Sequence, residues 1–494
     1  MKQTLVGYAP DADPTTQGVF TNCAAIVPSL RGFKAAPSAA TGTITSALAS
    51  ACKGSAVGRK LDDSARLFAG TSTKLYESSG SGWTDRTRVS GGDYTLAGSD
   101  RWRFAQFGDV SLAATKTDIL QGSSSGAFAN VAANAPKGAI VEVVGQFVFL
   151  CDVNDQGAIG PYSDTPHRWW CCAKGDHTVW TPSATNECTT GTLTSTPGKI
   201  RAARKFGDNL VVYKHRSMYL LVYVSGAAVW DPRLIPGECG AASQESVVNV
   251  GTTSNPRHVF MGFDDFYSFD GSRPVSIAEN WVKQTVFGEL NKSFAESSMA
   301  MRDPINNLVY FFYCTNSAGT CDKCVVYNDR TGRWGRDDRE VEALVEYLST
   351  GLTYDDLGTT YATYADLPNV SYDASFWTSG FPIPAIFNSS HLIQPLNGTP
   401  GASSITTGDV GDDNIESLVR RVKPRFMTAP TAASMVNYYR QNLGDSLTTD
   451  ATTSISSGRF DVLREARWHR FRYDFTGAME MNLIDYELAE SGSE

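Results

Sequence analysis

The sequence predicts a mainly β protein: a β-propeller of six or seven blades, followed by an additional C-terminal β-sandwich-like domain. The apolar runs are short and rich in Val, Tyr and Phe, as in residues 219–224 and 309–313, which is typical of buried strands. Tight polar turns recur near residues 70, 108, 145, 207, 264, 306 and 355, in steps of 38, 37, 62, 57, 42 and 49 residues. Propeller blades repeat every ~40–50 residues. A large sandwich with regularly spaced hairpins stays open as the alternative.

The chain divides into four parts by this pattern. Residues 1–60 have little alternation and are predicted to form an N-terminal arm or irregular edge, and residues 61–400 are predicted to form the propeller. Residues 401–416 are rich in Ser, Thr, Gly and Asp, which is typical of a linker. Strand patterns resume in residues 417–494, the predicted C-terminal β-domain, although residues 414–421 also fit two turns of helix.

Composition excludes several classes of protein. The chain has 494 residues, with 43 Lys and Arg against 52 Asp and Glu, so its formal net charge is −9. A hydrophobic content of 41% excludes disorder, and the acidic balance lacks the basic excess of a protein that grips nucleic acid. Because no signal peptide precedes Asp11 and Asp13, we expect synthesis in the cytoplasm and ten reduced, mostly buried cysteines.

The familiar motifs of catalytic and metal sites are incomplete. The histidines lack a His-Glu-x-x-His pattern, and Cys321 and Cys324 form a single pair where a structural zinc site needs two. Residues 54–60 depart from the phosphate-loop spacing, and Ser163 stands where a calcium loop beginning at Asp152 needs Glu. The sequence therefore predicts no catalytic, cofactor-binding or metal-ligating residue, and a protein that is not an enzyme.

Seven segments between residues 100 and 475, in this order, resemble one protein family. They are Trp102 with residues 104–109 (FAQFGD), then residues 175–182 (GDHTVWTP), 236–241 (PGECGA), 246–248 (SVV), 266–271 (FYSFDG), 325–334 (VVYNDRTGRW) and 467–472 (RWHRFR). Together they resemble the tail nozzle (tail hub) proteins of short-tailed bacteriophages. The sequence departs from that family at His177, where a Pro is usual, and at the unusual residues 170–172.

The resemblance implies a structural virion protein that forms the distal tail tube or nozzle ring, through which DNA is ejected. It implies a homo-oligomeric ring of six copies in the virion tail, made in the host cytoplasm. The implied partners are the portal and adaptor proteins, tail fibres or spikes, DNA that passes without specific binding, and the host envelope at ejection. The family supplies no catalytic residue.

An acidic lining would suit a DNA channel because it repels phosphate. The candidate channel-lining residues are the turn carboxylates Asp264, Asp265, Asp355 and Asp356. The alternative is that they are ordinary turn residues, since Asp bonds its own backbone in turns. Two other functions stay open: a propeller enzyme that degrades glycans, with two carboxylates ~5–10 Å apart, and a receptor-binding tail protein with exposed aromatic residues on its loops.

Overall fold

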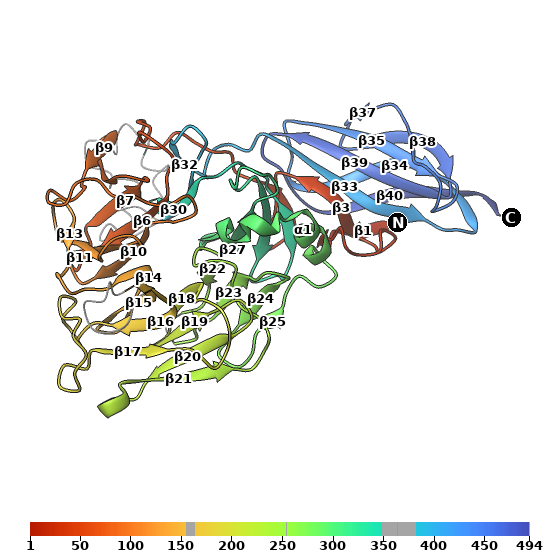
Figure 1. Ribbon diagram of the computed structural model, residues 1–494. Coiled ribbons are helices and arrows are strands. Elements are labelled where there is room, and N and C mark those ends of the chain that lie inside the picture. The colour runs from red at the N-terminus through yellow and green to blue at the C-terminus, as the bar shows by residue number, and fades with distance from the viewer. Residues whose placement is uncertain (155–163, 253, 348–362, 364–381, 494) are drawn as a thin grey trace.

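A computed structural model describes residues 1–154, 164–252, 254–347, 363 and 382–493. In these residues seven antiparallel blades surround a common axis, and a second body made of two sheets, one of them continuous with a blade, extends from one side of them (Figure 1). The prediction of a mainly β protein with a propeller of six or seven blades is confirmed: six blades have four described strands each, and the seventh has three.

The first four blades follow one another along the chain, each running from the axis outward. Blade one contains β6 (Gly54–Arg59), β7 (Ala65–Gly70), β8 (Leu75–Ser79) and β9 (Gly82–Asp85). Blade two contains β10 (Arg103–Phe107), β11 (Val110–Ala114), β12 (Gln121–Ser123) and β13 (Ala129–Asn130). Blade three contains β14 (Lys137–Val144), β15 (Phe147–Asn154), β16 (Thr165–Cys171) and β17 (Thr189–Thr192). Blade four contains β18 (Ala202–Phe206), β19 (Asn209–Tyr213), β20 (Met218–Tyr223) and β21 (Trp230–Ile235), with the 3-10 turn η1 (Gly226–Ala228) before β21.

Three further blades close the ring. Blade five contains β22 (Val247–Asn249), β23 (His258–Met261), β24 (Phe266–Phe269) and β25 (Val275–Ser276). The helix α1 (Lys283–Glu289) and the 3-10 segment η2 (Lys292–Ser297) lead to blade six, with β26 (Met299–Asp303), β27 (Leu308–Tyr313), β28 (Lys323–Asn328) and β29 (Trp334–Arg336). Blade seven contains β30 (Ala343–Tyr347), β31 (Ile383–Phe387) and β32 (Ile393–Pro395). Because β30 contacts both β26 and β6, the ring is complete.

An N-terminal segment covers the outer edge of blade seven. Ser38 forms an antiparallel bridge with Gly398, and the backbone N–H of Ala40 donates to the carbonyl of Pro395 at 2.8 Å. Ile44 and Leu48 are 4% exposed and pack into the core that blades seven and one share. Residues 36–53 form no strand, but they bury apolar surface at the closure of the ring, so they are not an arm.

The second body is a sandwich of two sheets. One sheet contains β1 (Lys2–Thr4), β4 (Ile26–Pro28), β5 (Phe33–Ala35), β34 (Ile415–Thr428), β38 (Phe460–Ala466) and β40 (Glu480–Ser493). The other contains β2 (Gly7–Tyr8), β3 (Val19–Ala24), β33 (Ala402–Gly411), β35 (Ala432–Arg440), β36 (Thr448–Thr449), β37 (Thr453–Ser454) and β39 (Trp468–Thr476). Side chains from both sheets share one core, which includes Phe20, Ile405, Val422, Tyr473 and Tyr486.

The sandwich begins earlier in the chain than the sequence predicts. Its sheets include five strands from residues 2–35, so the prediction of an N-terminal arm is wrong there too. The predicted linker is mostly the strand β33, and the candidate helix at 414–421 falls in β34. Buried residues of β33 alternate with half-buried ones from Ser403 to Thr407, and the small polar side chains of these two residues are buried. The Ser and Thr residues of β33 are therefore part of a packed strand and not of a linker.

One sheet joins the sandwich to the propeller. The outermost strand of blade six, β29, pairs with β4 through Arg336 and Ile26, and β4 continues the ladder to β5 and β40. The apolar core of the sandwich is likewise continuous with residues of blades five and six. The two bodies are thus connected by hydrogen bonds and a shared core as well as by the chain.

The turns predicted from sequence are hairpins, but they are not equivalent. Gly108, Gly145 and Gly207 follow the innermost strands of blades two, three and four, with φ of 55°, 57° and 60°. Each opens a two-residue loop, a position that favours glycine because φ is positive. The predicted centres at residues 70 and 264 lie instead beside turns between second and third strands. Gly and Asp suit any tight turn, so their spacing does not identify the strand pair. The centre at 355 lies outside the described residues.

The ten cysteines are all buried and present as free thiols, as the sequence predicts. Among the described helices, none has the length and hydrophobicity needed to cross a membrane.

Candidate functional site

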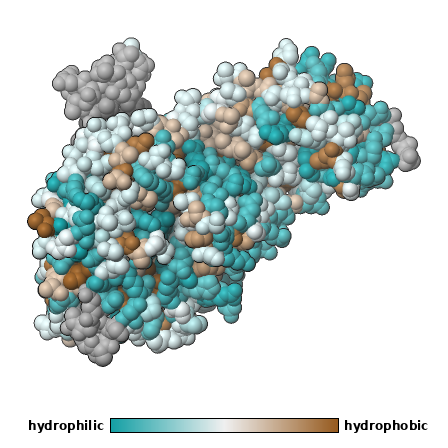
Figure 2. Space-filling view, turned by 45° about the horizontal axis from the view of Figure 1, so that its top comes forward, coloured by the Kyte–Doolittle hydropathy of each residue, from teal (hydrophilic) through white to brown (hydrophobic). Residues whose placement is uncertain are grey.

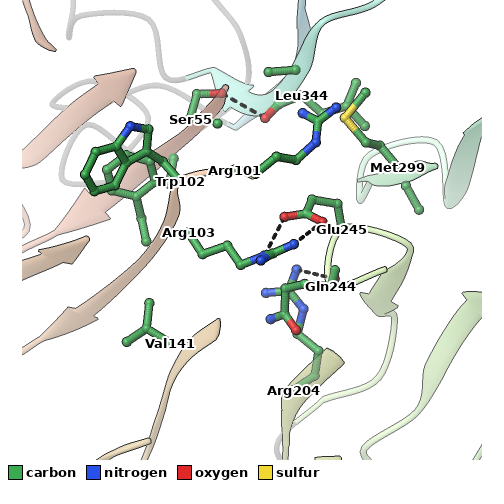
Figure 3. Close-up of a pocket in the computed structure, with 15 residues that line it drawn as sticks. Ser55, Arg101, Trp102, Arg103, Val141, Arg204, Gln244, Glu245, Met299 and Leu344 are labelled. Atoms are coloured by element: carbon green, nitrogen blue, oxygen red, sulfur yellow. Dashed lines mark hydrogen bonds and ion pairs between the residues drawn. The ribbon is translucent and has the colours of Figure 1, made fainter. Parts of the chain in front are cut away.

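Two cavities lie on the propeller axis, between the innermost strands. One cavity of about 170 Å³ is lined from the start of these strands, and a second of about 480 Å³ is lined further along them. The two cavities share five lining residues: Ser55, Ala56, Arg204, Ala300 and Leu344. Small side chains from blades one and six leave this space open, and Figure 3 shows the side chains around the first cavity.

An ion pair crosses the first cavity. Arg103 in β10 donates from Nε to Oε1 of Glu245 at 2.8 Å and from Nη2 to Oε2 at 3.2 Å, and its Nη1 donates to the carbonyl of Ala139 at 2.8 Å (Figure 3). Glu245 directly precedes β22, so the pair joins blade two to blade five, on opposite sides of the ring. Burial alone would raise the pKa of Glu245, but the charge and hydrogen bonds of Arg103 hold it below its usual value. The pair closes the axis at this level.

Gln244 supports this closure from blade five. Its side chain is 2% exposed; its Oε1 accepts from the N–H of Ala203 at 2.7 Å, and its Nε2 donates to the carbonyl of Ala203 at 2.9 Å. The innermost strand of a blade has no neighbouring strand on its inner edge. The Gln244 amide therefore makes the hydrogen bonds to Ala203 that a neighbouring strand would make. Nη2 of Arg204 donates to the backbone carbonyl of Gln244 at 3.1 Å.

The second cavity carries charges of both signs. Arg204, Lys205 and Arg302 line it together with Glu142 and Glu346. Nη1 of Arg204 lies 3.6 Å from Oε2 of Glu142. Burial raises the pKa of both carboxyls above the usual value, although Arg204 acts against the rise at Glu142 and Arg302 acts against it at Glu346. The side chain of Glu142 is 18% exposed, whereas that of Glu346 is exposed to the space that it lines.

The charges form a belt around the axis. Each blade contributes at least one charged residue from its innermost strand or just before it, and blade four also contributes Lys205. When one residue is taken from each blade, the sign alternates from blade two to blade seven. The residues, from blade one to blade seven, are Arg59, Arg103, Glu142, Arg204, Glu245, Arg302 and Glu346. We call this set the axial belt.

The predicted channel-lining residues lie away from the axial belt. Asp264 and Asp265 form the turn between β23 and β24. Asp265 is 2% exposed, pairs with Nζ of Lys283 at 2.8 Å and accepts from the N–H of Phe266 at 2.7 Å, so the prediction that it lines a channel is wrong. Asp264 is exposed and accepts from the Tyr267 hydroxyl at 3.1 Å, and its role in a channel stays a prediction. Asp355 and Asp356 lie outside the described residues.

Sequence reasoning missed the axial belt, although one signal was present. Glu142 and Arg204 each stand three residues before the glycine of a hairpin turn (145 − 142 and 207 − 204). A charged residue at a fixed distance from the turn, beside apolar residues of the same strand, indicates a position that faces the axis rather than the core. The pairing of Arg103 with Glu245, 142 residues apart, has no such signal.

The part of the chain that the structure describes contains no group of three or more His, Cys, Asp or Glu side chains placed to hold a metal ion. On the surface, the view in Figure 2 shows hydrophobic residues as separate spots among hydrophilic ones. Leu61 and Val89 are the most exposed of the large hydrophobic residues described, at 82% and 92%.

Comparison with known proteins adds information on the fold only. No family model matches the chain, and no curated protein matches it. Among solved structures, the WD40 domain of Pan2 from Neurospora crassa is similar, with 7% sequence identity and a TM-score of 0.34 over 61% of this chain and 83% of that one. Human WBSCR16 is similar over 60% of this chain and 85% of that one, with 9% identity and a TM-score of 0.31. Similarities this weak carry no argument about function.

Proposed function

We propose that the chain is a structural virion protein, a subunit of the tail nozzle ring of a short-tailed bacteriophage. The seven ordered segments that resemble this family support the proposal, and several of their residues build the propeller. Trp102, Trp180 and Trp334 are at most 2% exposed, and each indole N–H donates to a backbone carbonyl, those of Thr71, His177 and Ile277. His177 stands where the family usually has Pro. The group of His177 that accepts the hydrogen bond of Trp180 is its backbone carbonyl, which any residue supplies.

The observation that carries the proposal is the closed axis. The ion pair of Arg103 with Glu245 crosses a cavity of about 170 Å³, which is far too small for a DNA duplex. DNA would therefore pass between several copies of the chain, as in a ring, and not through the propeller of one copy. A ring needs heterologous contacts whose rotation closes.

The join between propeller and sandwich fits such a subunit. A shared core and the continuous ladder from β29 through β4 to β40 hold the two bodies in one arrangement. A stiff, elongated subunit presents two separate surfaces, one for its neighbours in the ring and one for proteins above or below it. The proposed partners are five further copies, the portal and adaptor proteins, tail fibres or spikes, and the host envelope at ejection.

Electron microscopy of the purified full-length chain tests this proposal, together with sedimentation across a range of concentrations. We expect closed rings of six copies with an open centre, and no retention of duplex DNA at physiological salt. A chain that sediments as a monomer at every concentration, or that binds duplex DNA tightly, would refute it.

The glycan-degrading alternative depends on Glu142 and Glu346, which line the same cavity. Hydrolysis by two carboxyls needs environments that push their pKa values apart. Here burial raises both, and an arginine opposes the rise at each, so the two environments are alike. The receptor-binding alternative needs exposed aromatic side chains, whereas the large, exposed apolar residues of the described chain are Met, Val, Leu and Ile. We therefore favour the structural role.

A further inference from the structure

The larger axial cavity has more donors than acceptors in reach of them. The Nε atoms of Arg204 and Arg302 are buried and have no hydrogen-bond partner. Arg302 comes from blade six and Arg204 from blade four, and both line the same cavity. A buried donor without a partner is costly, and more so when it belongs to a charged group. These Nε atoms are closed off by protein, so an occupant of the cavity would meet the two arginines through their Nη groups.

The groups that hold these arginines leave part of each guanidinium free. Nη1 of Arg302 makes a long hydrogen bond of 3.4 Å to the carbonyl of Asn249. Nη2 of Arg204 donates to the carbonyl of Gln244 at 3.1 Å, and its Nη1 stands 3.6 Å from Glu142. No ion pair within 4 Å joins Arg302 or Glu346 to a partner in the described part of the chain. Because Arg302 and Glu346 line the same cavity without forming an ion pair, space for an occupant remains between their side chains.

The lining also carries a local positive excess. Arg204, Lys205 and Arg302 outnumber Glu142 and Glu346, in a chain whose net charge is −9. Because the ion pair of Arg103 with Glu245 closes the axis beside this space, the cavity of about 480 Å³ is blind at that end. Its size suits a small molecule, and enclosure strengthens the attraction between an arginine and an anion relative to bulk water.

We propose that this cavity binds a small oxyanion with two or more negative charges, of the phosphate or polycarboxylate class, between the guanidinium groups of Arg204 and Arg302. Planar guanidinium groups hold such oxyanions through paired, charge-assisted hydrogen bonds. The anion would link blades four and six across the axis, much as Glu245 links blades five and two. This site is independent of the proposed role in a nozzle ring.

Isothermal titration calorimetry on the full chain tests the proposal, with inorganic phosphate and citrate as probes in a buffer of matched ionic strength. We expect one site per chain, and Arg302→Gln or Arg204→Gln to weaken binding about tenfold or more. Arg233→Gln is the matched control, because Arg233 lies on the outer strand of blade four, is 60% exposed and pairs only with its neighbour Asp231. It should bind like the wild type.

The variant Glu346→Gln distinguishes an effect on anion binding from a loss of folded protein. This change removes a negative charge from the cavity wall and should tighten binding about threefold or more, which a damaged protein would not do. Absence of heat with both probes, an unchanged affinity in Arg302→Gln and Arg204→Gln, or weaker binding in Glu346→Gln would each overturn the proposal.

Discussion

The ion pair of Arg103 with Glu245 is predicted to stabilise the propeller from its axis. Glu245→Gln keeps the shape of the side chain and removes its charge. The guanidinium of Arg103, only 18% exposed, would then keep the carbonyl of Ala139 as its remaining strong acceptor. Blades two and five would lose their direct connection across the ring.

The size of the effect follows from burial. Removing one partner of a fully buried ion pair costs about 3–5 kcal/mol, and an exposed pair contributes about 0–1 kcal/mol. Arg103 and Glu245 are 18% and 21% exposed, and the pair is bidentate, at 2.8 and 3.2 Å. We therefore expect Glu245→Gln to lower the free energy of unfolding by about 2–3 kcal/mol, and Arg103→Gln by a similar amount.

Urea denaturation followed by tryptophan fluorescence measures this in a double-mutant cycle. The double variant, with Gln at positions 103 and 245, should recover part of the loss, with a coupling energy of about 1.5 kcal/mol or more. The exposed pair of Arg233 with Asp231, 60% and 46% exposed, is the control and should show a coupling below about 0.5 kcal/mol.

The dependence on pH gives a second readout. Because Arg103 lowers the pKa of Glu245, the contribution of the pair is fully present above the unfolded value of 4.5 and is lost as the pH falls through the lower folded value. A coupling energy no larger than that of the Arg233 pair, or one that persists unchanged below that range, would refute the reasoning.

Three other predictions concern stability. Glu346→Gln should raise the melting temperature at pH 7, because burial raises the pKa of Glu346 and the folded state then holds an unfavourable charge; the gain should shrink towards pH 4.5, and a less stable variant at pH 7 would contradict this. Leu48→Ala should cost about 2–4 kcal/mol in urea denaturation because Leu48 is buried where the ring closes, whereas Leu30→Ala, at a residue 65% exposed, should cost less than about 0.5 kcal/mol. Asp265→Asn should cost about 1–3 kcal/mol by leaving Lys283 unpaired, and Asp264→Asn less than about 0.5 kcal/mol; equal losses would contradict the different burial of the two residues.

Local chemistry was enough to predict the propeller. Turn glycines such as Gly145 and Gly207 and the apolar strands beside them are legible in the sequence, because both depend on neighbouring residues alone. The strands near the ends of the chain were harder to predict from the sequence. The strand β1 is three residues long and pairs with β40, more than 470 residues away, so nothing near it in the sequence indicates a strand.

The predicted linker shows how polar composition misleads. Asp409 in β33 is 3% exposed, yet its carboxylate accepts from Nη2 of Arg440 at 2.6 Å and from Nε of Arg470 at 2.9 Å. Arg440 lies on β35 and Arg470 lies on β39, and β39 is the strand that pairs with β33. A buried carboxylate is acceptable there because both arginines neutralise it, and that compensation is visible only once the strands are assembled.

The axial belt follows from the same constraint, applied to a ring. Alternation of sign is favourable for the seven residues of the axial belt, because like charges in a low dielectric repel strongly. Seven is odd, so signs cannot alternate all the way round, and one junction must join like charges. In this chain that junction lies between Arg59 of blade one and Arg103 of blade two. Arg59 is paired there with Asp63, from Nη1 to Oδ1 at 2.9 Å, in the turn that follows its own strand. The carboxylate of Asp63 thus balances the positive charge of Arg59 at this junction, and Arg103 is balanced across the axis by Glu245.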